Sequence, residues 1–272
     1  MIPINFIYSI GFRCYSPDFL KNHNIRNMSG PFDWGIFDIE TAFANINNNF
    51  DIFLKDIVVV NKYKKINKIF YSDKKINKKI IDFIKKNEYI CYMAHNYINN
   101  TIVINQNFIN ETPSNLYHWD RICMFRHTDI TEKSKYDTVC KRIDIFKNIY
   151  KNRTKNMCLF YVTRILETEN IEQYQKNIYD MKKKYNINCY IIIIICSDRL
   201  DDYYIFENDI LFIIKKVDDY SYQIRDFNGG NSGVDGRGKN DVSNGIKEYN
   251  IIKKIFCLDL MTYEQIISKY AI

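Results

Sequence analysis

The sequence contains no Cys-x-x-Cys pair, although eight cysteines occur among its 272 residues. Structural zinc sites are usually built from closely spaced cysteine pairs, so we expect no metal site. Several of the cysteines lie within apolar, strand-like stretches of a long chain. Such cysteines are typically reduced and buried, so no disulfide framework is expected.

Long apolar runs are also missing. The longest aliphatic run, Ile191 to Ile195, is far too short to span a bilayer. The N-terminus has neither the basic segment nor the long apolar stretch of a secretory signal. We therefore expect a protein of the cytoplasm, or of the host cytoplasm if the chain is viral, with no membrane partner.

Glycine is scarce, and six of the nine glycines fall within residues 228–246. This segment has neither the spacing of a phosphate-binding P-loop nor that of the dinucleotide fingerprint, and it does not connect a strand to a helix. Residues 228–246 are therefore predicted to form a flexible surface loop, and no cofactor is expected.

Apolar and aromatic residues are abundant, at 46% hydrophobic content with 22 tyrosines and 18 phenylalanines. This composition is typical of a globular protein. The net charge is +7, but the lysines are spread along the chain, so we do not expect nucleic acid as a partner. No repeat or domain boundary is visible, and a single domain over residues 1–272 is predicted.

The clearest secondary-structure pattern begins at residue 157. A strand at 157–163 and a helix at 169–185 are followed by the apolar run 189–196, which does not alternate with polar residues. Such a run is typical of a central parallel strand buried on both faces. With further strands at 209–214 and 254–260, the sequence predicts an α/β layered fold with a mainly parallel central sheet and flanking helices.

The opening segment concentrates the unusual chemistry of the chain. An apolar strand ends at Gly11, and Ser16 with the following Pro-Asp predicts the start of a helix. Cys14 lies between the two, where backbone N–H groups and the helix dipole can lower a thiol pKa. It is either a nucleophile or a small apolar residue packed under the turn. Asp33 lies between Phe32 and Trp34, where a carboxylate is costly unless solvated or paired.

A second polar group follows the predicted strand 122–125. His127 and Asp129 lie at its end, and Thr131 is predicted to cap the next helix. Cysteine catalysis requires an imidazole within hydrogen-bond reach and a third group that orients it. His127 therefore serves either as a base or as a partner of Asp129 that holds the helix start. His95, at the end of another predicted strand, is its main rival, whereas His23 and His118 lie in exposed helix or loop contexts.

Five short segments resemble a domain-of-unknown-function family of bacteria and large DNA viruses that is described as papain-like cysteine peptidases. The resemblance covers residues 4–165 and is carried, in order, by Ser9 to Cys14 (SIGFRC), Gly30 to Trp34 (GPFDW), Asn48 to Leu54, Phe125 to Asp129 (FRHTD) and Tyr136 to Phe146. It implies a papain-like α+β fold, which is the alternative to the parallel sheet predicted above.

The resemblance also implies roles for individual residues. Cys14 would be the nucleophile and His127 the base, and Asp129 or Asp33 would orient the imidazole or line the pocket. Arg142 stands alone where family members commonly have two arginines.

We therefore expect a cysteine-dependent hydrolase or acyltransferase with Cys14, His127 and Asp129 as catalytic residues. Asp33, Trp34, Arg142 and His95 are expected to bind a small-molecule, peptide or glycan substrate. One alternative is a glycan-acting enzyme, such as a glycosyltransferase, in which Asp33, Asp129 and Arg142 matter and Cys14 is dispensable. Members of the family often accompany polysaccharide-assembly genes. The other alternative is a non-catalytic binding module, and the oligomeric state is left open.

Overall fold

The computed structural model of the protein describes residues 1–11, 15–33, 35–61, 65–72, 74–86, 101–108, 123–125, 128–164, 170–197, 200–216 and 245–270. Four of the predicted site residues, Cys14, Trp34, His95 and His127, lie outside these ranges, as does His118. Most of the predicted loop, residues 228–244, lies outside them as well. The remaining predicted site residues, Asp33, Asp129 and Arg142, are described.

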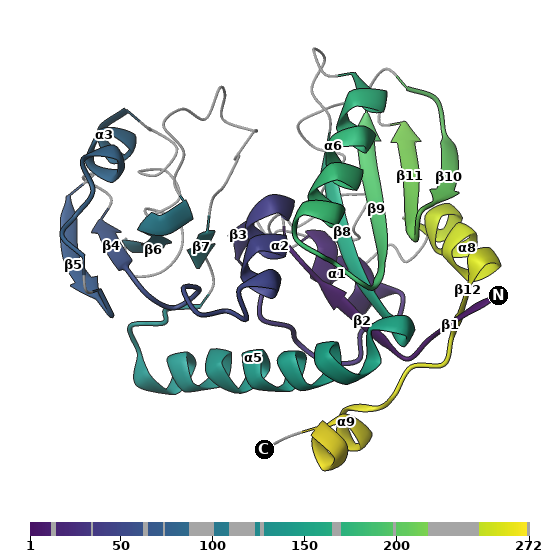
Figure 1. The fold of residues 1–272 in the computed structure, drawn as a ribbon, viewed down its shortest axis with the longest axis horizontal. Coiled ribbons are helices and arrows are strands. Elements are labelled where there is room, and N and C mark those ends of the chain that lie inside the picture. The colour runs from purple at the N-terminus through teal and green to yellow at the C-terminus, as the bar shows by residue number, and fades with distance from the viewer. Residues whose placement is uncertain are drawn as a thin grey trace, which may run out of the picture.

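A five-stranded sheet forms the larger half of the molecule, with the strand order β10-β11-β9-β8-β2 (Figure 1). All neighbouring strands in it are parallel except β10 and β11, which form an antiparallel pair at one edge. The predicted mainly parallel α/β sheet is confirmed. Its strands are β2 (Phe6–Ser9), β8 (Met157–Arg164), β9 (Tyr190–Ser197), β10 (Tyr203–Glu207) and β11 (Ile210–Lys216).

Helices cover both faces of this parallel sheet, which is why β9 is apolar throughout. On one face, Leu159 and Ile193 pack in a cluster with Ile178 of α6 (Ile171–Lys184). On the other face, Phe160 and Ile194 pack with residues of α1 (Tyr15–Asn22) and α8 (Ile246–Ile255). A strand covered on both sides has no solvated face, so it carries no alternating pattern.

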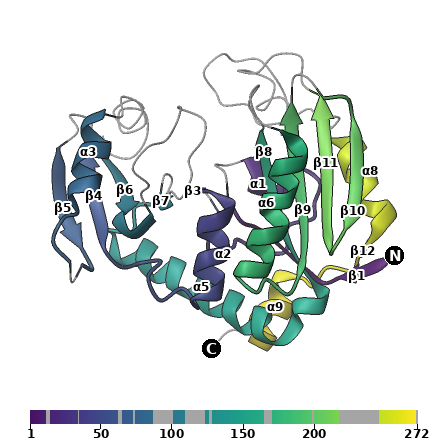
Figure 2. The same ribbon diagram turned by 45° about the horizontal axis from the view of Figure 1, so that its top comes forward.

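The second five-stranded sheet is antiparallel, with the order β3-β7-β6-β4-β5. The long helix α5 runs along the lower side of both sheets (Figures 1 and 2). One apolar cluster contains residues of both sheets and of the helices near them. The elements of this half are β3 (Ile36–Phe37), α2 (Ile39–Asn47), β4 (Ile57–Asn61), β5 (Ile66–Phe70), α3 (Lys78–Lys86), β6 (Thr101–Asn105), η1 (Gln106–Phe108), β7 (Cys123–Phe125), α5 (Lys133–Arg153) and η2 (Thr154–Asn156).

The C-terminal strand differs from its prediction. Within the predicted strand 254–260, only β12 (Phe256–Leu258) is a strand. It pairs with β1 (Ile2–Ile4) and does not join the five-stranded parallel sheet. The following helix α9 (Tyr263–Tyr270) begins with a capping box. Gln265 Oε1 accepts a hydrogen bond from Thr262 N at 2.8 Å, and Gln265 N donates to Thr262 Oγ1 at 3.3 Å.

Two predicted helix caps are wrong. Ser16 lies inside α1, where its hydroxyl donates to Gly11 O at 2.7 Å and accepts from Val162 N at 2.9 Å. Thr131 precedes α5 but donates its hydroxyl to Asp129 Oδ1 at 2.6 Å, and Glu132 is the cap residue. The two hydroxyls therefore do not accept hydrogen bonds from the backbone N–H groups of the helix starts that they were predicted to cap.

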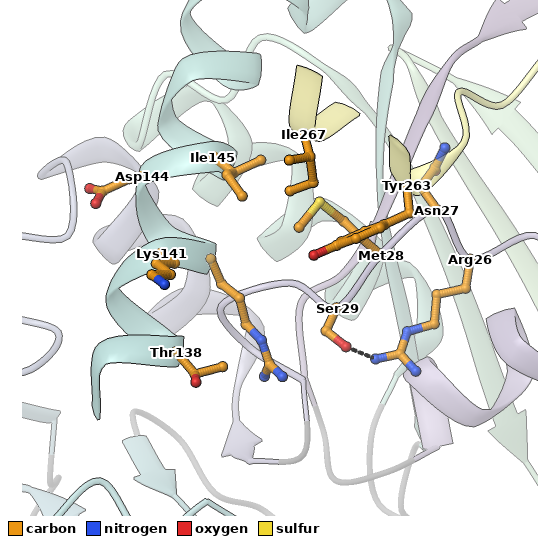
Figure 3. A pocket seen from close by; sticks show the side chains of 11 residues that line it. Arg26, Asn27, Met28, Ser29, Thr138, Lys141, Asp144, Ile145, Tyr263 and Ile267 are labelled. Carbon is orange, nitrogen blue, oxygen red and sulfur yellow. Dashed lines mark hydrogen bonds between the residues drawn. The ribbon is translucent and has the colours of Figure 1, made fainter. Parts of the chain in front are cut away.

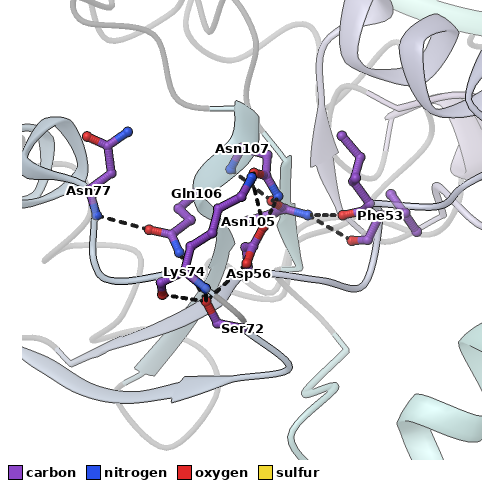
Figure 4. A network of polar contacts seen from close by, with 9 residues as sticks. Phe53, Asp56, Ser72, Lys74, Asn77, Asn105, Gln106 and Asn107 are labelled. Atoms are coloured by element: carbon purple, nitrogen blue, oxygen red, sulfur yellow. Dashed lines mark hydrogen bonds and ion pairs between the residues drawn. The ribbon is translucent and has the colours of Figure 1, made fainter.

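A polar network holds the antiparallel sheet to the turn before β4 (Figure 4). Asn105 Nδ2 donates to the carbonyl oxygens of Ile52 and Phe53, at 2.7 and 3.0 Å. The buried Asp56 carboxylate accepts from Ser72 Oγ at 3.0 Å and Asn107 Nδ2 at 2.9 Å. Burial opposes ionisation of Asp56, but these hydrogen bonds and the nearby Lys74 together lower its pKa.

Candidate functional site

The chain passes from the carboxyl end of β2 to the start of α1 at one edge of the parallel sheet. The Ser16 hydroxyl fixes this crossing, because it binds Gly11 on one side and Val162 of the neighbouring strand β8 on the other. Open α/β sheets bind ligands at such an edge, where strand ends meet helix N-termini. Residues 12–14 connect these two elements.

Gly11 is required by the close approach of another strand. Its φ of +122° is unfavourable for residues with a side chain, and a Cβ placed there would lie 2.5 Å from Phe37 O. The missing side chain therefore lets β3 lie directly against the end of β2.

Asp33 is buried and paired. Its side chain is 1% exposed, and Oδ2 accepts hydrogen bonds from Arg26 Nη2 at 2.6 Å and from Gly30 N at 3.0 Å. Arg26 Nη2 also donates to Ser29 Oγ at 2.5 Å. The sequence predicted that this carboxylate must be solvated or paired, and it is paired with an arginine that sequence reasoning did not identify.

Burial and charge act in opposite directions on Asp33. Burial raises its pKa, whereas the Arg26 charge and hydrogen bond, the Gly30 N–H and the Arg142 charge lower it; burial has the largest effect. Asp33 Oδ1 is buried and has no hydrogen-bond partner in the part of the chain that the structure describes.

Two further ionisable side chains lie near this pair. Tyr8 of β2 packs against Gly30, where an added Cβ would be 3.0 Å from the ring, and its burial raises its pKa, as does the Asp33 charge. Asp18, in the first turn of α1, has its pKa raised to about 6 by burial, while Arg26 lowers it and Asp33 raises it. The start of α1 is thus within electrostatic reach of the Arg26–Asp33 pair.

Arg142 of α5 completes the cluster. Burial lowers its pKa, the Asp33 carboxylate raises it, and Arg26 lowers it. Asp33 and Arg142, both predicted to bind substrate, are therefore brought near each other. Arg26 was missed because nothing in the sequence around it marks a partner for Asp33.

A pocket of about 760 Å³ lies between residues 26–29, α5 and α9 (Figure 3). Basic, apolar and aromatic side chains share its walls. The lining residues are Arg26, Asn27, Met28, Ser29, Thr138, Lys141, Arg142, Asp144, Ile145, Tyr263 and Ile267. Tyr263 and Lys141 come from helices more than 100 residues apart in the sequence.

Asp129 is buried and holds the turn before α5. Its Oδ1 accepts from Thr131 N at 3.1 Å and from Thr131 Oγ1 at 2.6 Å. Its Oδ2 makes no hydrogen bond to any other described residue. His23, expected in an exposed position, is buried with its ring 4.5 Å from that of Phe19 and 4.9 Å from that of Tyr249.

Three of the described cysteines have thiol pKa values shifted in the opposite direction to the one expected for Cys14. Burial raises the pKa of the Cys140, Cys158 and Cys189 thiols, that of Cys189 to about 12. A raised pKa disfavours the reactive thiolate. Cys257 is exposed.

Within the described ranges, no three His, Cys, Asp or Glu side chains are grouped to bind a metal ion. None of the helices in the same ranges has the length and apolar character needed to cross a membrane. The chain has no significant match to a protein-family model, to a curated protein or to a solved structure.

Proposed function

We propose that the protein is a cysteine-dependent hydrolase or acyltransferase with Cys14 as nucleophile and His127 as base. The observation that carries this proposal is the crossing from β2 to α1, which Ser16 fixes at the carboxyl edge of the parallel sheet. Cys14 immediately precedes the first residue of α1. Unpaired N–H groups and the helix dipole at such a position favour the thiolate.

In the proposed reaction, the Cys14 thiolate attacks an acyl carbon and forms a tetrahedral oxyanion. N–H groups at the start of α1 would stabilise that charge. The His127 imidazolium then donates a proton to the leaving group, which departs as the acyl-enzyme forms. Water, or an acceptor in acyl transfer, gives its proton back to His127 and releases the acyl group.

Asp129 is proposed to orient His127. Its Oδ1 is held by Thr131, which fixes the carboxylate, while Oδ2 makes no hydrogen bond to another described residue. A fixed carboxylate with one available oxygen suits the third position of a catalytic triad. Asp33 and Arg142 are proposed to lie on the substrate side, as are Trp34 and His95.

The alkylation rate of Cys14 tests this proposal without a known substrate. We expect iodoacetamide to modify Cys14 with a midpoint below the ordinary thiol pKa of about 8.5. The exposed Cys257 in the same protein is the internal reference, with both sites quantified by peptide mass spectrometry. In His127→Gln, the Cys14 midpoint should move up toward that of Cys257. Equal midpoints for Cys14 and Cys257 in the unmodified sequence would refute the proposed nucleophile.

The nearness of Arg142 to Asp33 favours a second candidate, a glycan-acting enzyme such as a glycosyltransferase. An acid and two arginines can hold the hydroxyl and phosphate groups of a sugar donor. Under this candidate, Cys14→Ala retains activity whereas Asp33→Asn and Arg142→Gln lose it. Full loss of activity in Cys14→Ala contradicts it.

A further inference from the structure

The pocket between residues 26–29, α5 and α9 has three basic side chains on its walls. Arg26 is engaged by Asp33 and Ser29, but neither Lys141 nor Arg142 forms an ion pair with any described residue. The Arg142 side chain is half-buried, whereas that of Lys141 is exposed. The nearby Asp33 carboxylate interacts with Arg142 but is bound directly by Arg26, so one negative charge faces two guanidinium groups. A bound anion would offset the positive charge that remains.

The only carboxylate on the described walls of this pocket does not neutralise these cations. Asp144 makes no ion pair with another described residue, and Figure 3 shows it pointing away from Arg26 and Ser29. Asp33 is already paired with Arg26 and is not among the lining residues. The remaining positive charge comes from Lys141 and Arg142.

A hydroxyl group adds a donor beside these cations. Ser29 Oγ accepts from Arg26 Nη2 at 2.5 Å, and its own hydrogen is given to no described residue. The hydroxyl of Ser29 can therefore donate to an oxygen of a bound ligand. Guanidinium, ammonium and hydroxyl donors together suit the several oxygens of a phosphate group.

The other walls are apolar and aromatic. Met28, Ile145 and Ile267 line the pocket together with Tyr263, which is 54% exposed. In Figure 3, Tyr263 and Met28 lie on the same side of the pocket as Ser29. A volume of about 760 Å³ falls in the range of pockets for small organic ligands and far exceeds the size of a free phosphate ion.

We propose that this pocket binds an organic phosphate, with the phosphate group on Arg142, Lys141 and Ser29 and an aromatic or ring-shaped organic part against Tyr263 and Met28. Exposed tyrosine rings stack on flat ligands, which gives the organic part its place. The inference concerns binding alone, so it holds whether or not Cys14 is a nucleophile.

Calorimetric titration of the full chain tests the pocket with four probes: phenyl phosphate, a nucleoside 5′-monophosphate, inorganic phosphate and phenol. We expect both phosphate esters to bind, inorganic phosphate to bind at least tenfold more weakly, and phenol not to bind. The affinity of the esters should fall with added salt, because the contacts are between charges.

Three variants test the contributions of the basic and aromatic lining residues one at a time. Arg142→Gln should weaken phenyl phosphate binding at least tenfold, and Lys141→Gln several-fold. Tyr263→Ala should weaken phenyl phosphate but leave inorganic phosphate unchanged. Lys151→Gln, an exposed lysine on the same helix that does not line the pocket, is the matched control and should bind as the unmodified chain does.

Thermal melting of each variant checks that it is folded before its titration is compared. Lys141 and Tyr263 are exposed, so their variants should fold. The inference is overturned if neither ester binds, or if Arg142→Gln binds phenyl phosphate as tightly as the unmodified chain does. It is also overturned if Lys151→Gln weakens binding as much as Arg142→Gln does. The alkylation assay of Cys14 is independent of these titrations. A low Cys14 pKa without ester binding refutes only the pocket, whereas ester binding with an ordinary Cys14 pKa refutes only the nucleophile.

Discussion

The Arg26 guanidinium donates to the Asp33 carboxylate over 2.6 Å, with 15% and 1% of the two side chains exposed. The two residues are seven positions apart, and the turn between them is closed by the Gly30 N–H, which binds the same carboxylate oxygen. This pair connects the residues beside β2 to the pocket, because Arg26 lines the pocket and Asp33 does not.

Breaking the Arg26–Asp33 pair should destabilise the fold strongly. Arg26→Met leaves the buried Asp33 without its cation, and we expect a loss of about 3 to 5 kcal/mol in the free energy of unfolding, measured with urea. Arg26→Met combined with Asp33→Leu should recover part of that loss. Lys135→Met, which breaks the exposed Lys135–Glu132 pair, is the control and should change stability by less than about 1 kcal/mol. Equal losses in the two single variants would contradict the buried pair.

Asp18 should make the protein less stable as the pH rises. Its pKa is raised to about 6 from an ordinary value of 3.8, mainly by burial. Below the ordinary value Asp18 is protonated in both the folded and unfolded chains, and between the two values the unfolded chain loses its proton first.

Asp18→Asn should therefore match the unmodified protein at pH 3 and be more stable by about 1 to 2 kcal/mol at pH 7. Urea unfolding at a series of pH values gives this difference directly. Asp137→Asn, which changes an exposed aspartate of α5, is the comparison and should show no comparable gain between pH 4 and 6. A gain at pH 3 as large as that at pH 7 would mean that the carboxylate charge is not the cause.

Asp56 should have the opposite pH dependence. Hydrogen bonds from Asn107 and Ser72, with the Lys74 charge, lower its pKa despite its burial. Its stabilising contribution is therefore present above the ordinary aspartate pKa and is lost as the pH falls through the lower folded value.

Asn107→Ala removes one of these hydrogen bonds and should cost about 1.5 to 3 kcal/mol at pH 7. The cost should shrink below pH 4, where Asp56 is protonated in the unfolded chain. Guanidinium unfolding at pH 7 and pH 3 measures both values. Asn188→Ala is the matched control, because the exposed Asn188 side chain donates to Asn186 Oδ1 and to no other described residue. A cost that does not change with pH would exclude the Asp56 charge as its origin.

Ser16→Ala should affect both stability and the proposed thiolate. The Ser16 hydroxyl joins Gly11 O to Val162 N in a buried setting, so its loss leaves two buried backbone groups without that partner. We expect a cost of about 2 to 3 kcal/mol in urea unfolding. The alkylation midpoint of Cys14 should also rise, because the start of α1 is no longer fixed.

Ser268→Ala is the control for that substitution, since its hydroxyl makes an exposed hydrogen bond to Gln265 O in α9. It should change stability by less than about 0.5 kcal/mol and leave Cys14 alkylation unchanged. If Ser16→Ala lowers stability without moving the Cys14 midpoint, Ser16 is a structural residue only.

Much of the parallel sheet could be predicted from the sequence because its pattern is local. Strand β9 can be recognised from its apolar run without knowledge of its partner strands, since a strand buried on both faces has no alternating polar residues. The same holds for Asp38 and α2: a short polar residue before an apolar-periodic stretch marks a helix start, and Asp38 accepts from Thr41 N at 2.8 Å. The lysine-rich segment 62–86 contains both strand β5 and helix α3, and β5 gains its stability from pairing with β4, which is not visible in the local pattern.

The sequence by itself determined the α/β class, the presence of helices α1, α5 and α6, and the need of Asp33 for a partner, because each depends on residues close in the chain. Only the tertiary structure decided which partner Asp33 takes, where Ser16 donates, that β12 pairs with β1, and that Tyr263 faces Lys141 across a pocket. These relationships join residues up to 254 positions apart, as in the pairing of Ile2 with Phe256. Their geometry follows from how the helices pack on the sheet, which no local pattern specifies.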